Sequence, residues 1–165
     1  MADFKIDGNK IVFSSGKIIE FISERDPANI KWASYGVEVV VECTGLFLTK
    51  ELAEKHTIGG AKKVILSAPP KGSGIKSVVI GVNEDILDDS DVVISNASCT
   101  TNNIAPLFKV IKSLGELENA YVSTVHSYTS DQRLHDAPHS DLRRARAAAQ
   151  SIVPTSTGAA KAIGT

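Results

Sequence analysis

The longest helical pattern in the chain begins shortly after a run of strand-forming residues. Over residues 104–114, apolar side chains recur every three or four positions, as in a helix that buries one face. Residues 91–95 favour a buried strand, and small polar residues separate the two segments. The pattern therefore predicts a strand, a tight turn and a helix, in which Pro106 fits the helix interior poorly.

Alternating and β-branched runs predict further strands along the chain. We expect strands over residues 4–6, 11–13, 17–22, 37–42, 63–67, 77–82, 91–95 and 121–125. Residues 7–10 (DGNK) would close a hairpin between the first two. Residues 37–42 are nearly all β-branched, which is typical of a strand covered on both faces. Short helices are predicted around Trp32 and from a cap at Thr49 to His56, which would lie at a surface helix end.

Strands that alternate with helices indicate an α/β protein with a largely parallel sheet. Ligands bind at the carboxyl ends of the strands in such sheets. Thr44, Ser67 and Cys99 each lie at or shortly after the end of a predicted strand. We therefore expect three strand ends to contribute to one binding site.

Composition narrows the class of protein without defining a reaction. The 165 residues carry a formal net charge of −1 and are 42% hydrophobic and 22% charged, as in an ordinary globular domain. This balance offers no general electrostatic attraction to nucleic acid or to a membrane surface. Two cysteines do not make a disulfide framework and indicate a reducing setting, and no apolar run reaches the roughly 18 residues of a membrane span.

Cys99 is the main candidate for chemistry. It lies at the predicted helix start, where unpaired N–H groups and the helix dipole stabilise an anion and lower the pKa of a thiol. The alternative is a small residue that closes a strand, because free cysteines are usually buried and inert. His126, at the end of a predicted strand, could be the base that an active thiol needs. These two residues alone are compatible with a cysteine hydrolase as much as with a redox enzyme.

Other kinds of site find less support in the sequence. A Gly-rich phosphate-binding turn is not recognisable, since residues 72–77 lack its third glycine and do not lead into a helix. His135 and His139 have a spacing that suits a metal, but Pro138 disfavours a helix there, so no metal site is predicted. The arginines within residues 143–146 would face solvent, an anion or a neighbouring subunit.

Several strings resemble segments of phosphorylating glyceraldehyde-3-phosphate dehydrogenase. The three most specific are residues 95–102 (SNASCTTN), 124–129 (TVHSYT) and 154–162 (PTSTGAAKA). Residues 24–27 (ERDP), 42–45 (ECTG) and 65–69 (ILSAP) match the same family. The resemblance covers essentially the whole chain in order. It implies an α/β fold with an incomplete Rossmann-like parallel-sheet domain at residues 1–98, followed by the start of an α+β catalytic domain at residues 99–165.

The resemblance also implies a reaction. This is the NAD-dependent oxidative phosphorylation of glyceraldehyde 3-phosphate to 1,3-bisphosphoglycerate in glycolysis, through a thioester on Cys99 with His126 as general base. Inorganic phosphate would cleave the thioester. The full-length enzyme would be a cytoplasmic homotetramer that uses no metal, nucleic acid or membrane. Erythrose-4-phosphate dehydrogenase, a close relative, is the alternative within the class.

Binding positions follow from the same resemblance. The attacking phosphate would be bound by Ser98, Thr100, Thr157 and Gly158. Thr129, with Asp131 near it, would bind the phosphate of the substrate. The coenzyme would be lined by Arg25, Thr44 and Ser67.

Some features depart from the family's pattern. Asn103 stands where many members have a second cysteine, which removes a possible local disulfide. Residues 129–150 resemble the family's S-loop, which lies between the coenzyme and a neighbouring subunit. In it Pro138 favours NAD over NADP, whereas Ala137 replaces a common leucine. The Gly-rich turn and the later catalytic segments are missing, so we expect a fragment that is inactive alone.

Overall fold

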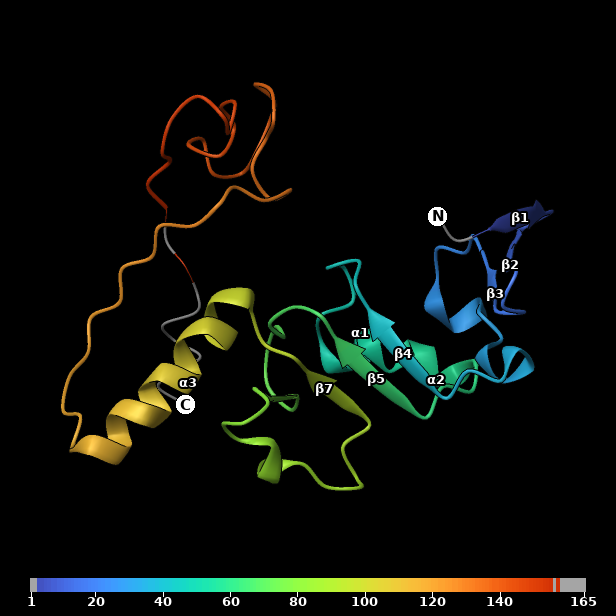
Figure 1. Ribbon diagram of the computed structural model, residues 1–165, viewed down its shortest axis with the longest axis horizontal. Coiled ribbons are helices and arrows are strands. Elements are labelled where there is room, and N and C mark those ends of the chain that lie inside the picture. Colours follow the sequence, from blue (N-terminus) through green and yellow to red (C-terminus); the bar gives the residue numbers. More distant parts are fainter. Residues whose placement is uncertain (1–2, 156, 158–165) are drawn as a thin grey trace. The chain divides into compact units, whose positions relative to one another are not determined.

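The computed structural model describes residues 3–155 and 157, and the chain forms two compact units (Figure 1). The first unit comprises residues 1–78 and 85–96, and the second comprises residues 79–84 and 97–165. Each unit has its own packing and is described by itself. The assignment of residues 1–98 to coenzyme binding and 99–165 to catalysis stays a prediction, because compactness does not identify a function.

The first unit begins with an antiparallel sheet of three strands. They are β1 (Phe4–Asp7), β2 (Lys10–Phe13) and β3 (Ile18–Glu20), in the order β1-β2-β3. Strands β1 and β2 pair from Phe4 with Phe13 to Asp7 with Lys10, so a two-residue turn joins them. Gly8 has a φ of 58° in this turn, a conformation that glycine adopts without steric cost. The predicted hairpin is confirmed.

A parallel sheet of four strands makes up the rest of the unit. The strands are β4 (Val39–Glu42), β5 (Lys63–Leu66), β6 (Lys76–Ser77) and β7 (Val93–Ser95). Their order is β4-β5-β7-β6, and every neighbouring pair is parallel, as in a partial Rossmann-like sheet. Figure 1 shows β4, β5 and β7 side by side. The α/β class is confirmed. Only Ser77 of the strand expected over residues 77–82 belongs to β6, and residues 79–82 instead form a turn in which the N–H of Val82 bonds to the carbonyl of Val79.

The core of the first unit lies against one face of this sheet. It is formed by Leu48, Ala53, Val64, Leu66 and Val93. Along β4 the side chains of Val40 and Glu42 are buried, whereas Val39 and Val41 are 50% and 58% exposed. The expectation that residues 37–42 are covered on both faces is therefore wrong, because the described residues leave Val39 and Val41 uncovered.

Short helices complete the first unit. They are the 3₁₀ helices η1 (Pro27–Asn29) and η2 (Trp32–Tyr35) and the α-helices α1 (Lys50–Ala53) and α2 (Lys55–Ile58). Thr49 caps α1 through a hydrogen bond from the N–H of Leu52, as predicted. The prediction that His56 lies at the surface is wrong, since it is only 4% exposed. The chain at Ile30 passes so close to Gly59 that a Cβ there would lie 1.7 Å from the Ile30 carbonyl oxygen.

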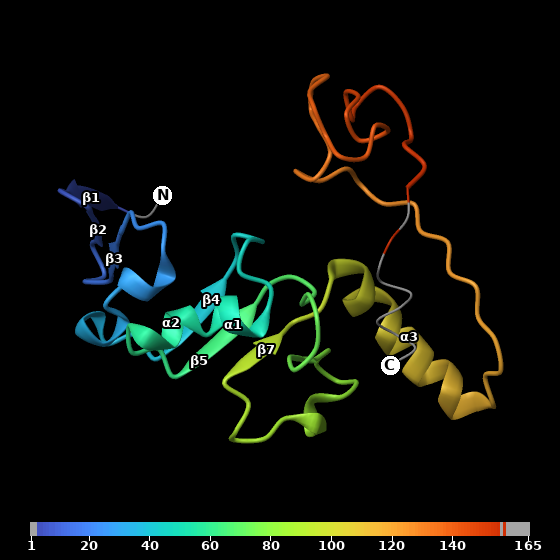
Figure 2. The same ribbon diagram turned by 180° about the vertical axis from the view of Figure 1, so that it is seen from behind.

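The second unit is organised around helix α3 (Cys99–Leu114), the longest helix among the described residues (Figures 1 and 2). It continues through Pro106, and its apolar residues Leu107, Val110 and Leu114 are exposed. After it the described chain forms no strand, so the strand predicted over residues 121–125 is wrong; Val125 is 91% exposed and has no strand to pair with. The sequence of residues 158–162 (GAAKA) also predicts the first turn of a helix, and these positions lie outside the described residues.

The described helices include none with the length and apolar character needed to cross a lipid bilayer.

Candidate active site

Cys99 is the first residue of helix α3, as the sequence predicted. Ser98 caps the helix, because its side-chain oxygen accepts a hydrogen bond from the N–H of Thr101 at 2.9 Å. The preceding residue, Ala97, is buried and has a φ of 56°, in the left-handed region that alanine rarely adopts. A tight turn therefore places the thiol at the helix N-terminus, where the helix dipole favours a negative charge.

His126 lies in contact with this thiol. The distance from Cys99 Sγ to His126 Nε2 is 3.4 Å, and both residues are exposed. The other ring nitrogen, Nδ1, lies 2.6 Å from the backbone carbonyl oxygen of Ser127. A carbonyl can only accept, so Nδ1 carries the proton of the neutral ring and Nε2 is free to accept the proton of the thiol.

The contacts of this pair change both acid–base equilibria in the direction of an ion pair. The pKa of Cys99 is lowered, chiefly by the hydrogen bond to His126, against a smaller opposing effect of burial and with help from Thr100. The pKa of His126 is raised by the Ser127 carbonyl first and by Cys99 second. A thiolate beside an imidazolium is the form that such shifts favour, and the thiolate is the nucleophilic form of cysteine.

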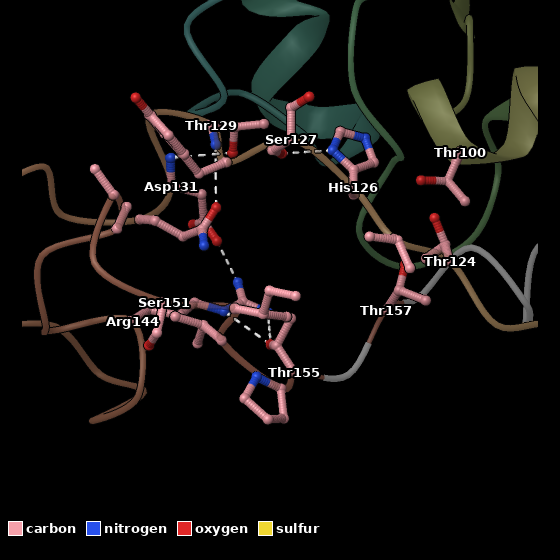
Figure 3. Close-up of a pocket in the computed structure, with 18 of the residues that line it drawn as sticks. Thr100, Thr124, His126, Ser127, Thr129, Asp131, Arg144, Ser151, Thr155 and Thr157 are labelled. Carbon is pink, nitrogen blue, oxygen red and sulfur yellow. Dashed lines mark hydrogen bonds and ion pairs between the residues drawn. The ribbon is translucent and has the colours of Figure 1, made fainter.

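Both residues of this pair line a cavity of about 760 Å³ within the second unit. Figure 3 shows its lining around His126. Thr100, Thr124, Thr129 and Thr157 line it together with His126, so hydroxyl groups surround the histidine. A space of this size with several convergent polar groups is typical of a site for a small polar molecule.

Arg144 also lines this cavity, a location that the sequence analysis did not identify. Its guanidinium donates through Nε to Oγ1 of Thr155 at 3.0 Å and through Nη1 to the carboxylate of Asp131 (Figure 3). Arg146 instead pairs with Asp136, and Arg143 donates to the carbonyl of Pro154. The sequence offers no signal that separates Arg144 from these two neighbours, because the loop path decides which arginine faces inward.

The predicted phosphate-binding residues have different locations. Thr100, Thr129 and Thr157 line the cavity with Cys99. Ser98 does not belong to its lining; its hydroxyl serves the helix cap and lies 2.7 Å from Oγ1 of Thr101. Gly158 lies outside the described residues.

The predicted coenzyme residues belong to the first unit. Thr44 and Ser67 are exposed and follow the neighbouring parallel strands β4 and β5, so they share the carboxyl edge of the sheet. Arg25 is exposed on the segment before η1. That these residues and Cys99 serve one site stays a prediction.

Among residues 3–155 and 157, no three His, Cys, Asp or Glu side chains come close enough to hold a metal ion. His139 of the histidine pair noted in the sequence is engaged otherwise. Its Nδ1 accepts from the N–H of Asp141 at 2.9 Å, and its Nε2 lies 3.8 Å from Oδ1 of Asp131.

Comparison with known proteins identifies two matching family models. Residues 2–50 match the NAD binding domain of glyceraldehyde 3-phosphate dehydrogenase, and residues 98–165 match the C-terminal domain of the same family.

Curated relatives show the same similarity over nearly the whole chain. Glyceraldehyde-3-phosphate dehydrogenase 1 of Bacillus subtilis is 53% identical over 163 residues, which are 98% of this chain and 48% of that protein. The Mycoplasma pneumoniae enzyme is 55% identical over 94% of this chain and 46% of its own length. Glyceraldehyde-3-phosphate dehydrogenase A, chloroplastic, of Nicotiana tabacum is 51% identical over 98% of this chain and 41% of its own length.

The chain thus spans about half the length of the curated relatives it matches. Both domain models come from one family, and they match in the order in which the two units follow along the chain. The chain belongs to the glyceraldehyde-3-phosphate dehydrogenase family.

Proposed function

We propose that the whole protein that carries this chain is an NAD-dependent glyceraldehyde-3-phosphate dehydrogenase of the phosphorylating type. It converts glyceraldehyde 3-phosphate, NAD and inorganic phosphate to 1,3-bisphosphoglycerate and NADH. The observation that carries the proposal is the 3.4 Å contact between Cys99 Sγ and His126 Nε2 at the N-terminus of α3. Family membership and the names of the relatives support it.

In this reaction Nε2 of His126 takes the proton of the Cys99 thiol, and the thiolate attacks the aldehyde carbon. The carbonyl oxygen becomes an alkoxide that the N–H of Cys99 and the helix dipole stabilise, and His126 returns the proton to it. The same nitrogen removes this proton again as the hydride leaves the carbon. Cys99 then carries a thioester.

An oxygen of inorganic phosphate attacks the thioester carbon, the C–S bond breaks, and Cys99 leaves as a thiolate. A thiolate of lowered pKa leaves more readily than an ordinary one, and the pKa of Cys99 is shifted in that direction. His126 in its protonated form would hold this leaving group by its charge.

NAD supplies the hydride acceptor when it is bound. The first unit fits such a coenzyme, because Thr44 and Ser67 expose hydroxyl groups at the carboxyl edge of a parallel sheet, where nucleotides bind in this class of fold. We assign both residues, with Arg25, to the coenzyme.

Two phosphate groups need positive charge and hydroxyl donors near Cys99. Arg144 supplies a guanidinium in the cavity, and Thr129 and Thr157 supply hydroxyl groups. A guanidinium offers several donors in a plane and suits phosphate oxygens. We therefore add Arg144 to the phosphate-binding residues expected from the sequence, which are Ser98, Thr100, Thr129, Thr157 and Gly158.

The finer features of the proposal concern assembly and setting. We propose a homotetramer in which residues 129–150 contribute to a subunit interface, and a cytoplasmic location. The supporting observations are the exposed Arg146 and Leu142 of that segment and the low cysteine content. Some relatives are named chloroplastic, so the location depends on the setting of the whole protein.

The test is NADH formation by the purified whole protein with glyceraldehyde 3-phosphate, NAD and phosphate. We expect turnover that needs all three and stops after Cys99→Ser. Faster turnover of erythrose 4-phosphate would identify the related dehydrogenase instead. Ester hydrolysis without NAD, lost in the same variant, would identify a cysteine hydrolase.

A further inference from the structure

A chain of two hydrogen bonds, the first part-buried and the second buried, links Trp32, His56 and Glu42 beside the end of strand β4. Trp32 Nε1 lies 3.2 Å from His56 Nδ1, and His56 Nε2 lies 3.0 Å from Oε2 of Glu42. Glu42 and His56 are 3% and 4% exposed. The rings of Trp32 and Phe47 pack against the imidazole with centroid separations of 5.8 and 6.2 Å. A buried pair of titratable groups is costly unless it is fully hydrogen-bonded, as this one is.

The direction of each hydrogen bond follows from the indole. An indole N–H can only donate, so Nδ1 of His56 accepts. The neutral ring then carries its proton on Nε2, where it donates to the Glu42 carboxylate. Burial acts to raise the pKa of Glu42, but hydrogen bonds from Thr44 and His56 outweigh it, and the pKa lies below its ordinary value. Trp32 therefore fixes the tautomer of His56, and His56 supports an ionised Glu42.

The second carboxylate oxygen of Glu42 determines the conformation of the loop after β4. Oε1 accepts from the backbone N–H of Thr44 at 2.6 Å and also from the Thr44 hydroxyl. The hydroxyl oxygen accepts in turn from the N–H of Leu46 at 3.1 Å. A hydroxyl has one proton and two acceptor sites. The exposed Thr44 is thus left with one acceptor site to offer a ligand.

We propose that Trp32 and His56 are positioning residues for the coenzyme, acting through Glu42 to present the Thr44 hydroxyl oxygen to a hydrogen-bond donor of NAD. This inference rests on the proposed function, which assigns Thr44 to the coenzyme. Trp32 and His56 make no contact with the ligand themselves. Their effect is to keep the Thr44 proton on Glu42, so that the hydroxyl accepts and does not compete as a donor.

The coupling of these residues can be measured in the whole protein by comparing two substitutions at one position. His56→Asn keeps an acceptor for Trp32 but is too short to reach Glu42. His56→Gln places an amide N–H near the former Nε2, where it can still donate to Glu42. We expect KM and Kd for NAD to rise about tenfold in the first variant and to stay within about threefold in the second, with kcat and the aldehyde KM little changed.

A double-mutant cycle separates positioning from general stability. Thr44→Val removes the hydroxyl, and we expect about the same rise in the Kd for NAD as in His56→Asn. In the double variant the Kd should not rise beyond that of Thr44→Val alone, because both changes remove one contact. The proposal is overturned if the two substitutions raise the Kd for NAD by factors that multiply in the double variant. It is also overturned if His56→Asn and His56→Gln raise the Kd for NAD equally.

Trp32→Phe keeps an aromatic ring and removes the indole N–H. It therefore tests the proposal if the His56 variants do not fold. We expect about a threefold rise in the Kd for NAD. Tyr35→Phe, in the same 3₁₀ helix, is the matched control and should leave it unchanged. An unchanged Kd in Trp32→Phe overturns the role of Trp32. If the wild-type protein turns over NAD but the effects of Thr44→Val and His56→Asn multiply in the double variant, the inference fails and the proposed function stands. If the wild-type protein does not bind NAD, the proposed function fails as well.

Discussion

Nε2 of His126 lies 3.4 Å from Sγ of Cys99, while the backbone carbonyl of Ser127 binds Nδ1 of the same ring. The carbonyl thus acts on the thiol from a distance, because it selects the tautomer in which the lone pair faces sulfur. No part of this arrangement requires burial, since both side chains are exposed.

The first prediction concerns the pH dependence of thiol alkylation in the whole protein. A lowered pKa means that the Cys99 thiolate persists to lower pH, and the raised pKa of His126 means that its imidazolium persists to higher pH. We expect the alkylation rate of Cys99 by iodoacetamide to reach half its maximum below the ordinary value of about 8.5. The midpoint should rise in His126→Asn. Peptide mass spectrometry separates Cys99 from Cys43, and an unchanged midpoint would contradict the interpretation.

The second prediction concerns the rate of turnover. His126→Asn removes the acceptor that faces the thiol, and a general base contributes about 10²–10⁴-fold to a rate. We expect kcat to fall by that order while the Kd for NAD stays within about twofold. His135→Asn is the matched control, because this exposed histidine does not line the cavity. Equal loss in both variants would argue against a base role.

The third prediction concerns Arg144. Arg144→Lys keeps the positive charge but loses the planar set of donors that binds Asp131 and Thr155. We expect the KM for inorganic phosphate, the aldehyde or both to rise about tenfold or more, with the KM for NAD unchanged. Arg146→Lys, a substitution in the same loop at a 76% exposed side chain, should change none of them. Initial-rate kinetics with each substrate varied in turn would distinguish the two phosphate sites.

The fourth prediction concerns stability. The lowered pKa of Glu42 means that its carboxylate stabilises the fold above the unfolded-state pKa of about 4.3, and that this contribution is lost as pH falls through the lower folded-state pKa. In Glu42→Gln the amide N–H faces the N–H of His56, so we expect the free energy of unfolding to fall by about 1–3 kcal/mol at neutral pH. Urea unfolding should show this difference narrowing in acid.

Glu38→Gln is the control for that experiment. Its carboxylate pairs with Lys62 at the surface, where both side chains are at least 65% exposed. Exposed ion pairs contribute little to stability, so the free energy of unfolding should change much less than in Glu42→Gln. A larger loss in Glu38→Gln than in Glu42→Gln would contradict the importance of the buried network.

The sequence predicted the features that depend on near neighbours. The cap at Thr49, the start of the helix at Cys99 and the hairpin around Gly8 need only residues a few positions apart. The pairing of the Cys99 thiol with the His126 imidazole was predicted from the two residue types and from the strings around them, which resemble those of a known family.

Features that depend on distant segments could not be predicted in this way. Residues 121–125 have the composition of a strand, but a strand also needs a partner, and the described chain offers none there. His56 has the position of a surface residue at a helix end, yet Trp32 and Phe47 cover it. The inward position of Arg144 depends on the path of a long loop, which local patterns do not encode.

The left-handed conformation of Ala97 limits which amino acids can occupy the position before Ser98. A positive φ favours glycine, asparagine and aspartate, and the 3% exposure of Ala97 leaves no room for a longer side chain. In a saturation library selected for activity, position 97 should therefore accept alanine and glycine and reject β-branched residues altogether. A residue that takes no part in the chemistry thus limits which sequences can place Cys99 at the start of the helix.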